Sequence, residues 1–269
     1  MKLQTQMVEK PWGRGDIAAA FAAPAGKRIG EIWFDAGGAP LPLLIKWLFT
    51  SDKLSVQVHP NDAQARARGA PSGKEECWYI VEAKPGACLG IGVKQPLNAE
   101  QLRAAAISGA IEDMMDWKPV QAGDYYYIPA GTVHAIGAGI TLVEVQQNAD
   151  ITYRLYDYGR LDNGALRTLH LDDGVAVSKP GPYSDARSGQ AVASKQLVDA
   201  PFFRLWLADG TPSWPSLTDA EKCWIIPISG HVTIDNERAN VGECYYINAE
   251  IPVIFGPASQ ALIAAEISA

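Results

Sequence analysis

The sequence is poor in the residues that mark several specialised classes of protein. Only 4 cysteines occur among 269 residues, which excludes a small scaffold held together by disulfides. No run reaches the roughly 18 uncharged apolar residues of a membrane helix, and the closest approach, residues 40–49, contains Lys46. Lys and Arg total 23 against 30 Asp and Glu, and the net charge of −7 disfavours a protein that binds nucleic acid. We therefore expect a globular, cytoplasmic protein that binds neither membranes nor nucleic acid.

Turn-forming residues, by contrast, are abundant along the whole chain. The 25 glycines and 18 prolines separate short runs of β-branched and aromatic residues. These runs, interpreted as strands, are residues 31–34, 54–59, 77–81, 125–128, 141–145, 224–228 and 245–247. Their spacing predicts a mainly β protein, either a sandwich or a barrel.

One short helical insertion is predicted after residue 97. Asn98 is a suitable N-cap and Gln101, three residues on, completes a capping box. The apolar positions that follow at near-helical spacing are Leu102, Ile107, Ile111 and Met114.

Two pairs of segments repeat in the same order. Residues 75–80 (EECWYI) resemble 221–226 (EKCWII), and residues 123–130 (GDYYYIPA) resemble 242–249 (GECYYINA). The shared order predicts two copies of one β unit. Residues 178–194 are rich in Pro, Gly and Ser without any periodicity, which is typical of a linker. We divide the chain into a first unit at 1–177, a linker at 178–199 and a second unit at 200–269.

Side chains that can bind a metal gather in three segments of the first unit. In residues 54–60 (LSVQVHP), strand alternation places Gln57 and His59 on one face. Glu76 lies in a strand of the repeat, and His134 follows a strand end that runs into a glycine turn. One amide, two imidazoles and one carboxylate form a mixed N/O set suited to a divalent transition metal such as Zn²⁺. The same spacing also suits hydrogen-bonded pairs, and it names no substrate.

The two copies of the repeat differ at these positions. Aligned without gaps, Lys222 stands opposite Glu76 and Val253 stands opposite His134. The second unit is therefore expected to keep the fold and to hold no metal.

Five motifs occur in the order found in one enzyme family. They are residues 43–48 (LLIKWL), 54–60 (LSVQVHP), 73–78 (GKEECW), 129–135 (PAGTVHA) and 144–154 (EVQQNADITYR). With residues 11–13 (PWG) and 30–33 (GEIW), they resemble the type I mannose-6-phosphate isomerases over residues 8–175. The chain is similar to the short bacterial form, without the extra helical domain of the long members. After residue 195 it matches little beyond the degenerate repeat.

The resemblance implies a fold, a reaction and a set of site residues. The fold is a cupin, a jelly-roll barrel with a zinc site inside, followed by a second, degenerate cupin-like unit. The reaction interconverts mannose 6-phosphate and fructose 6-phosphate, with a small phosphosugar as partner and one divalent metal ion per chain. The implied metal ligands are Gln57, His59, Glu76 and His134. Arg154 is the implied active-site arginine, and Lys46 and Lys74 belong to the substrate pocket.

These residue types suit a reaction that passes through an enediol. Such a step needs a Lewis acid, a base near C2, and cations for the developing oxyanion and the phosphate. Arg154 offers a planar fork, and Lys46 and Lys74 offer point charges. Glu144, with Gln146 on the same face of its predicted strand, is the preferred base. The alternative general base is Lys74 with a depressed pKa. Glu144 could also have a purely structural role, as the ion-pair partner of Arg154.

Two other functions remain open at this point. One is a non-catalytic cupin that binds a sugar or sugar phosphate as a sensor, and the other is an isomerase or epimerase of a related phosphosugar. The presence of both Glu144 and Arg154 favours an enzyme over a sensor. The sequence names neither the preferred phosphosugar, nor the metal loaded in the cell, nor the oligomeric state.

Overall fold

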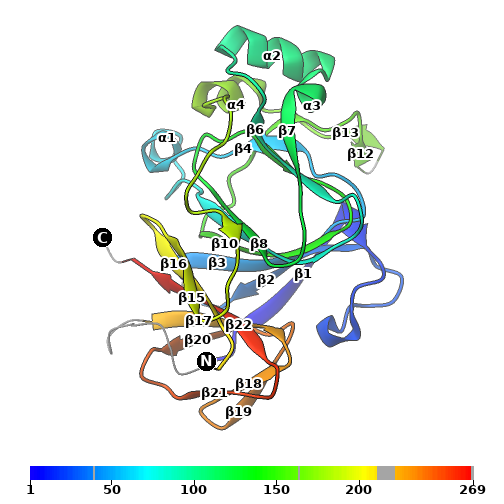
Figure 1. The fold of residues 1–269 in the computed structure, drawn as a ribbon. Coiled ribbons are helices and arrows are strands. Elements are labelled where there is room, and N and C mark those ends of the chain that lie inside the picture. The colour runs from blue at the N-terminus through cyan, green and yellow to red at the C-terminus, as the bar shows by residue number, and fades with distance from the viewer. Residues whose placement is uncertain (39, 163, 211–221, 268–269) are drawn as a thin grey trace.

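The computed structural model describes residues 1–267 except 39, 163 and 211–221. Over these residues the chain is mainly β, and two units built from antiparallel strands lie against each other (Figure 1). The mainly β fold, with a second unit that resembles the first and a short helical insertion, is confirmed. No helix in the described part of the chain is long and apolar enough to cross a membrane.

The first unit closes two antiparallel sheets around a common interior (Figure 1). The larger sheet contains, in spatial order, β1 (Gln4–Arg14), β2 (Ile29–Asp35), β3 (Leu43–Phe49), β10 (Ile140–Gln147), β5 (Glu76–Ala83), β8 (Asp124–Ile128) and β14 (Gly189–Gln190). The smaller sheet contains β11 (Tyr153–Tyr156), β4 (Val56–Val58), β9 (His134–Ile136), β6 (Cys88–Val93) and β7 (Met115–Pro119).

Three of the helices, α2 (Ala99–Ser108), α3 (Ile111–Met114) and α4 (Leu171–Val177), pack on the outer face of the smaller sheet (Figure 1). The other helical elements are η1 (Ala19–Phe21) and α1 (Asp62–Arg66), and a short hairpin joins β12 (Leu161–Asp162) to β13 (Ala165–Leu166). Val56 and Val58 of β4 are fully buried against Leu102 of α2 and Val177 of α4. Since side chains alternate along a strand, this outward packing leaves Gln57 and His59 facing the barrel interior.

The helical insertion begins as predicted and ends earlier. Asn98 and Gln101 form the predicted capping box. Helix α2 then stops at Gly109, whose φ of 82° lies in the left-handed region that glycine adopts without strain, and α3 starts separately. The predicted apolar face is wrong at Ile107 and Met114, which are 65% and 38% exposed, whereas Leu102 and Ile111 are buried. Ile107 follows Leu102 by five residues, which places it on a different side of the helix.

The second unit repeats the strand order of the first. Its larger sheet contains, in spatial order, β15 (Lys195–Asp199), β16 (Phe203–Ala208), β22 (Gln260–Glu266), β17 (Lys222–Ser229) and β20 (Tyr245–Asn248). These strands correspond in order to β2, β3, β10, β5 and β8 of the first unit. Its smaller sheet contains β19 (Glu237–Asn240), β18 (His231–Ile234) and β21 (Val253–Phe255), which correspond in order to β7, β6 and β9 of the first unit. Lys222 opens β17 as Glu76 opens β5, and Val253 opens β21 as His134 opens β9. A counterpart of β4 would fall between β16 and β17, where residues 211–221 lie outside the described part.

One hydrophobic core joins the two units. Cys77 and Tyr79, on the outward face of β5, belong to the same buried cluster as Phe203 and Leu205 of β16. Burying one such apolar side chain contributes about 1.5–3 kcal/mol, so the second unit stabilises the sheet that carries β5. Its other face, which carries Glu76 and Trp78, points into the barrel.

The division at residues 1–177, 178–199 and 200–269 stays a proposal. The proposed linker contains paired strands, because β14 hydrogen-bonds to β8 and β15 hydrogen-bonds to β16. The first residues also contact the second unit, since the Leu3 amide donates to the Cys244 carbonyl at 2.9 Å.

Candidate active site and metal centre

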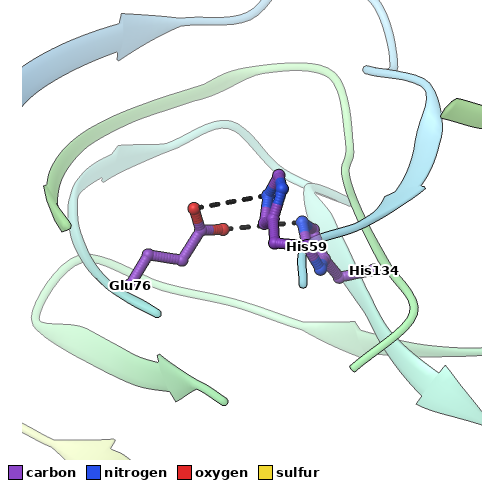
Figure 2. A group of neighbouring side chains, drawn as sticks. All are labelled: His59, Glu76 and His134. Carbon is purple, nitrogen blue, oxygen red and sulfur yellow. Dashed lines mark ion pairs between the residues drawn. The ribbon is translucent and has the colours of Figure 1, made fainter. Parts of the chain in front are cut away.

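Three buried side chains from three segments meet inside the first barrel. His59 directly follows β4, Glu76 opens β5 and His134 opens β9. Their potential ligand atoms all lie within 4.8 Å of one another. His59 Nε2 is 3.6 Å and His134 Nε2 is 3.5 Å from a Glu76 carboxylate oxygen (Figure 2). Each side chain is at most 2% exposed, so the group is shielded from water.

Backbone carbonyls orient both imidazoles. His59 Nδ1 donates to the Ile151 carbonyl and His134 Nδ1 donates to the Thr132 carbonyl, each at 2.8 Å. Because a carbonyl only accepts, Nδ1 carries the proton and Nε2 presents its lone pair to Glu76. Burial lowers the pKa of His134 to about 4 and that of His59 well below its usual value. Both rings are therefore neutral at neutral pH, which is the form that binds a metal ion.

The donor set fits a divalent metal ion. Among the described residues neither carboxylate oxygen of Glu76 has a hydrogen-bond partner of good geometry, although the Lys74 ammonium lies 2.8 Å from one of them. A buried carboxylate without hydrogen bonds is costly unless a cation neutralises it. Burial and the charge of Glu144 raise the pKa of Glu76 in spite of the nearby Lys74 ammonium, so a bound cation would stabilise this carboxylate further. Two imidazole nitrogens and a carboxylate are typical ligands of Zn²⁺.

Gln57 lies beside this cluster on β4. It pairs with His134 across the β4–β9 ladder, and its Nε2 lies 3.3 Å from His134 Nε2. Rotating the amide by half a turn would exchange Nε2 for Oε1, which would then face the cluster as a fourth oxygen donor. Gln57 is half-buried, whereas the other three side chains are fully buried.

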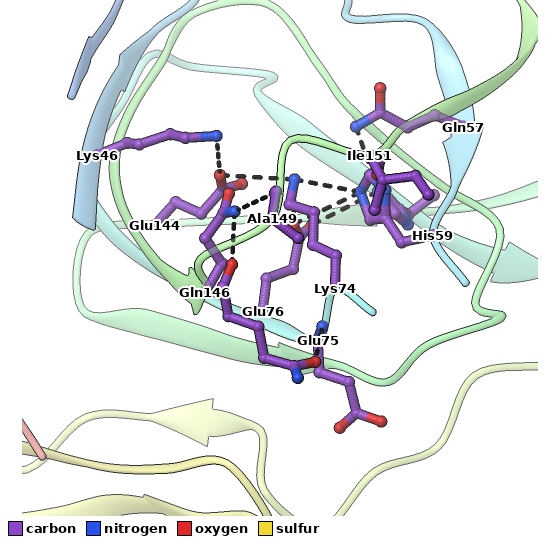
Figure 3. A network of polar contacts seen from close by, with 12 residues as sticks. Lys46, Gln57, His59, Lys74, Glu75, Glu76, Glu144, Gln146, Ala149 and Ile151 are labelled. Carbon is purple, nitrogen blue, oxygen red and sulfur yellow. Dashed lines mark hydrogen bonds and ion pairs between the residues drawn. The ribbon is translucent and has the colours of Figure 1, made fainter. Parts of the chain in front are cut away.

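Glu144 is held by two lysines and a tryptophan. Lys46 Nζ lies 3.3 Å and Lys74 Nζ lies 3.8 Å from Glu144 Oε1 (Figure 3). Trp78 Nε1 donates to Glu144 Oε2 at 3.0 Å. Lys46 and Trp78 reach it because both are its direct cross-strand neighbours in the sheet. Burial would raise the pKa of Glu144, but the two ammonium charges and the indole bond outweigh it and lower the pKa. The ion pairs of Glu144 are thus with lysines rather than with Arg154.

The pKa of Lys74 is raised, whereas a role as general base would need a lowered pKa. Burial alone would lower the pKa of its ammonium, but the charges of Glu144 and Glu76 outweigh burial and raise it. The expectation of a depressed Lys74 pKa is therefore wrong. Lys74 Nζ also lies 3.3 Å from His59 Nε2, so this ammonium sits between the candidate metal ligands and Glu144.

Arg154 comes from the edge strand β11, where it pairs with Gln57 across the ladder. Its guanidinium donates to the Thr168 carbonyl at 2.8 Å, and its backbone amide donates to His170 Nδ1 at 3.1 Å. These bonds fix Arg154 against the segment that follows β13. Gln146, by contrast, donates to the carbonyls of Gln147 and Ala149 and so holds the chain after β10.

A cavity of about 260 Å³ opens over these residues. It is lined by the predicted Lys46, Gln57, Lys74, Glu144 and Arg154, and by residues that sequence reasoning missed, namely Lys10, Trp12, Glu31, Trp33, Leu48, Leu54, Ser55, Ile136, Asp150, Thr152 and Arg167. Lys10 and Trp12 had a usable signal, since Lys10 precedes the PWG motif and Trp12 is its central residue. Arg167 had none, because it lies beyond the last motif and a hairpin brings it back.

Two antiparallel sheets closed around a buried His–Glu cluster define a cupin with a candidate metal site. The mannose-6-phosphate isomerase of Streptococcus mutans is 35% identical over 215 residues, covering 77% of this chain and 68% of that protein. The mannose-6-phosphate isomerase of Bacillus subtilis is 44% identical over 142 residues, covering 52% of this chain and 45% of that protein. The chain belongs to the mannose-6-phosphate isomerase family, whose members are enzymes.

A solved structure supports the fold over the whole chain. The crystal structure of a mannose 6-phosphate isomerase from Bacillus subtilis superimposes with a TM-score of 0.78, at 24% identity and 98% coverage of both chains. No family model matches the sequence.

Proposed function

We propose that this chain interconverts mannose 6-phosphate and fructose 6-phosphate with one bound zinc ion. The observation that carries the proposal is the placement of the His59–Glu76–His134 cluster beside a pocket that contains several cationic side chains. His59, Glu76 and His134, with Gln57, would hold the ion. When bound, a divalent ion polarises the carbonyl and hydroxyl oxygens of the sugar as a Lewis acid.

The proton transfer is assigned to Glu144. Its carboxylate would take the proton from C2 of the open-chain aldose, and the C2–H electron pair would form the C1=C2 bond while the carbonyl electrons move to O1. The same carboxylic acid would return the proton to C1 as the O2 proton passes to O1 and the C2 ketone forms. Because the pKa of Glu144 is lowered, the carboxylate is ionised at neutral pH. Sugar oxygens that draw the lysine hydrogen bonds away would increase its basicity.

Three cations complete the chemistry in this proposal. Lys74 and Lys46 would donate hydrogen bonds to the sugar oxygens that gain negative charge, since both contact Glu144 and both are buried. Arg154 would stabilise the enediolate through its planar fork. Burial of the lysines strengthens these interactions relative to water.

The phosphate is assigned to the more exposed end of the pocket. C6 is four carbons from C2, so the phosphate cannot lie among the groups that act on C1 and C2. Arg167 is held there by Asp157, whose Oδ2 accepts from its guanidinium at 3.1 Å, and Lys10 is held by Glu31 at 3.5 Å. Both cations line the cavity and are only half-buried, as a group that meets the substrate first should be.

Replacing Arg167 by alanine is expected to raise KM for mannose 6-phosphate by about 10- to 100-fold with kcat nearly unchanged. A hydrogen bond to a charged group contributes about 1.5–3 kcal/mol, and binding lost equally from ground and transition states appears in KM alone. Arg103→Ala is the matched control, because Arg103 pairs with Asp172 on the surface away from the pocket. Steady-state kinetics decide it, and an unchanged KM in Arg167→Ala would exclude this phosphate contact.

The overall proposal is tested by a coupled assay with mannose 6-phosphate before and after chelation. We expect the chelator to abolish turnover and added Zn²⁺ to restore it. Tight binding of the sugar phosphate without turnover would instead establish a non-catalytic sensor. Faster turnover of a different phosphosugar would assign a related isomerase or epimerase.

A cytoplasmic location belongs to the same proposal. All four cysteines lie in the described part of the chain and are free thiols. Persistent free thiols are typical of a reducing compartment.

A further inference from the structure

Glu75 lies just before the start of β5, between two residues of the candidate site. Lys74, the candidate catalytic cation, precedes it, and Glu76, a candidate metal ligand, follows it. The strand begins only at Glu76, so the sheet ladder does not by itself fix Lys74 and Glu75. In Figure 3 the Glu75 carboxylate points away from the Lys74 ammonium and from the imidazole of His59. Glu76 is paired with Gln146 and Ile128 in the sheet, and the Lys74 amide donates to the Pro60 carbonyl at 3.0 Å. The contacts of Glu75 on the opposite side add to these restraints on the direction of Lys74 and Glu76.

Glu75 is held by two partners. Its backbone amide donates to Gln147 Oε1 at 3.0 Å, and its carbonyl accepts from the Gln147 amide at 3.1 Å. Its carboxylate accepts a hydrogen bond from the Tyr127 hydroxyl. The Tyr127 bond is the one that engages the Glu75 side chain.

Tyr127, on β8, is fixed by the proposed linker. Its amide donates to Ser188 Oγ at 3.0 Å, and its carbonyl accepts from the Tyr183 hydroxyl at 2.5 Å. The guanidinium of Arg187 lies over its ring at 3.9 Å. Residues 183–188 thus hold the backbone and one ring face of Tyr127.

The second unit also contacts Tyr127. The rings of Tyr127 and Phe203 of β16 are 5.8 Å apart, and both residues are fully buried in the core that joins the two units. Burial raises the pKa of the Tyr127 phenol, so its hydroxyl stays protonated and donates. Through Tyr127 and Glu75 the second unit is thus connected to β5, the strand that carries the candidate ligand Glu76. The second unit itself has Lys222 and Val253 where the first has Glu76 and His134.

We infer that Tyr127 is a positioning residue, through which the linker and the second unit orient Lys74 and Glu76 by holding Glu75. The inference deepens the proposed function and rests on it, because it assigns the second unit a role in the same metal site. It explains why a unit with a degenerate site packs against the outward face of β5.

Tyr127→Phe removes only the hydroxyl and tests the inference directly. We expect metal affinity and kcat each to fall by about 10-fold, since the loss of groups that orient metal ligands typically costs about 10–100-fold. The KM for mannose 6-phosphate should stay within about 2-fold, because the phosphate contacts are remote. Tyr79→Phe is the matched control. Tyr79 lies in the same core on the outward face of β5, and its hydroxyl has no hydrogen-bond partner among the described residues.

A second set of variants separates positioning from general stability. Glu75→Gln keeps an oxygen that accepts from Tyr127 and should retain metal affinity, whereas Glu75→Ala should match Tyr127→Phe. The double variant Tyr127→Phe/Glu75→Ala should lose no more than either single variant, because both remove one interaction. Metal affinity is measured by competition with a chromogenic chelator, and melting curves are recorded for every variant.

Two results would overturn the inference. One is wild-type metal affinity and kcat in Tyr127→Phe, and the other is an equal loss in Tyr79→Phe. Failure of the proposed function has a different signature, because the wild-type protein itself would then bind no metal or turn over no mannose 6-phosphate.

Discussion

Replacing His59 or His134 by alanine is expected to remove most of the bound metal and to lower kcat/KM by at least about 100-fold. Loss of either imidazole leaves three donors, and even groups outside the ligand set typically cost about 10–100-fold when removed. Both rings are oriented by a backbone carbonyl at 2.8 Å, and alanine offers no donor atom in their place. Elemental analysis of the purified variants, together with the coupled assay, measures both effects.

Two further variants sharpen this result. Gln57→Ala should lose less metal, because a neutral amide oxygen is the weakest of the four donors and Gln57 is only half-buried. His231→Ala is the matched control, since His231 lies in the second unit and should leave one metal ion per chain. That stoichiometry also tests whether the second unit holds no metal. Full occupancy in both His59→Ala and His134→Ala would remove the metal assignment.

Replacing Arg154 by alanine is expected to lower kcat by about 10²–10³, which corresponds to roughly 3–4 kcal/mol of transition-state stabilisation. The reason is that negative charge grows on the sugar oxygens as the enediolate forms, and a fixed guanidinium interacts more strongly with that charge than with the ground state. The Thr168 carbonyl orients the fork in advance at 2.8 Å, so little reorganisation accompanies the reaction.

Steady-state kinetics beside a melting curve separate this role from two others. If Arg154 anchored the phosphate, KM would rise with kcat nearly kept, as expected for Arg167→Ala. If it acted only through its bonds to Thr168 and His170, a lower melting temperature would be the main defect. An Arg154→Ala enzyme with near-normal kcat would show that the catalytic cation lies elsewhere.

Much of the fold could be predicted because its signals are local. Each predicted strand overlaps a strand of the structure, and the capping box at Asn98 forms as its residue types indicate. The end of the helix was missed, because the apolar residues continue through Ile107 to Ile111 while the left-handed Gly109 interrupts the chain before Ile111. A glycine in that conformation ends a helix more strongly than apolar spacing extends it.

The convergence of the candidate ligands could also be predicted, but their electrostatics could not. Alternation alone puts Gln57 and His59 on one face, and the repeat marks Glu76 and His134 by what replaces them in the second unit. The pKa of Lys74 is a sum over charges brought together by folding, and the carboxylates of Glu76 and Glu144 reverse the effect of burial. No single segment contains that information.

By itself the sequence determined the β architecture, the doubled unit, the family resemblance and the four candidate ligands, because each follows from residue type, alternation or order along the chain. The tertiary structure decided which groups share a pocket. It brought Arg167 back to the cavity through a hairpin, and it paired Glu144 with Lys46 and Lys74. It also joined Tyr127 to Glu75 across the core shared by the two units. These contacts link residues distant in sequence, and their energies depend on distance and burial, which only the folded chain defines.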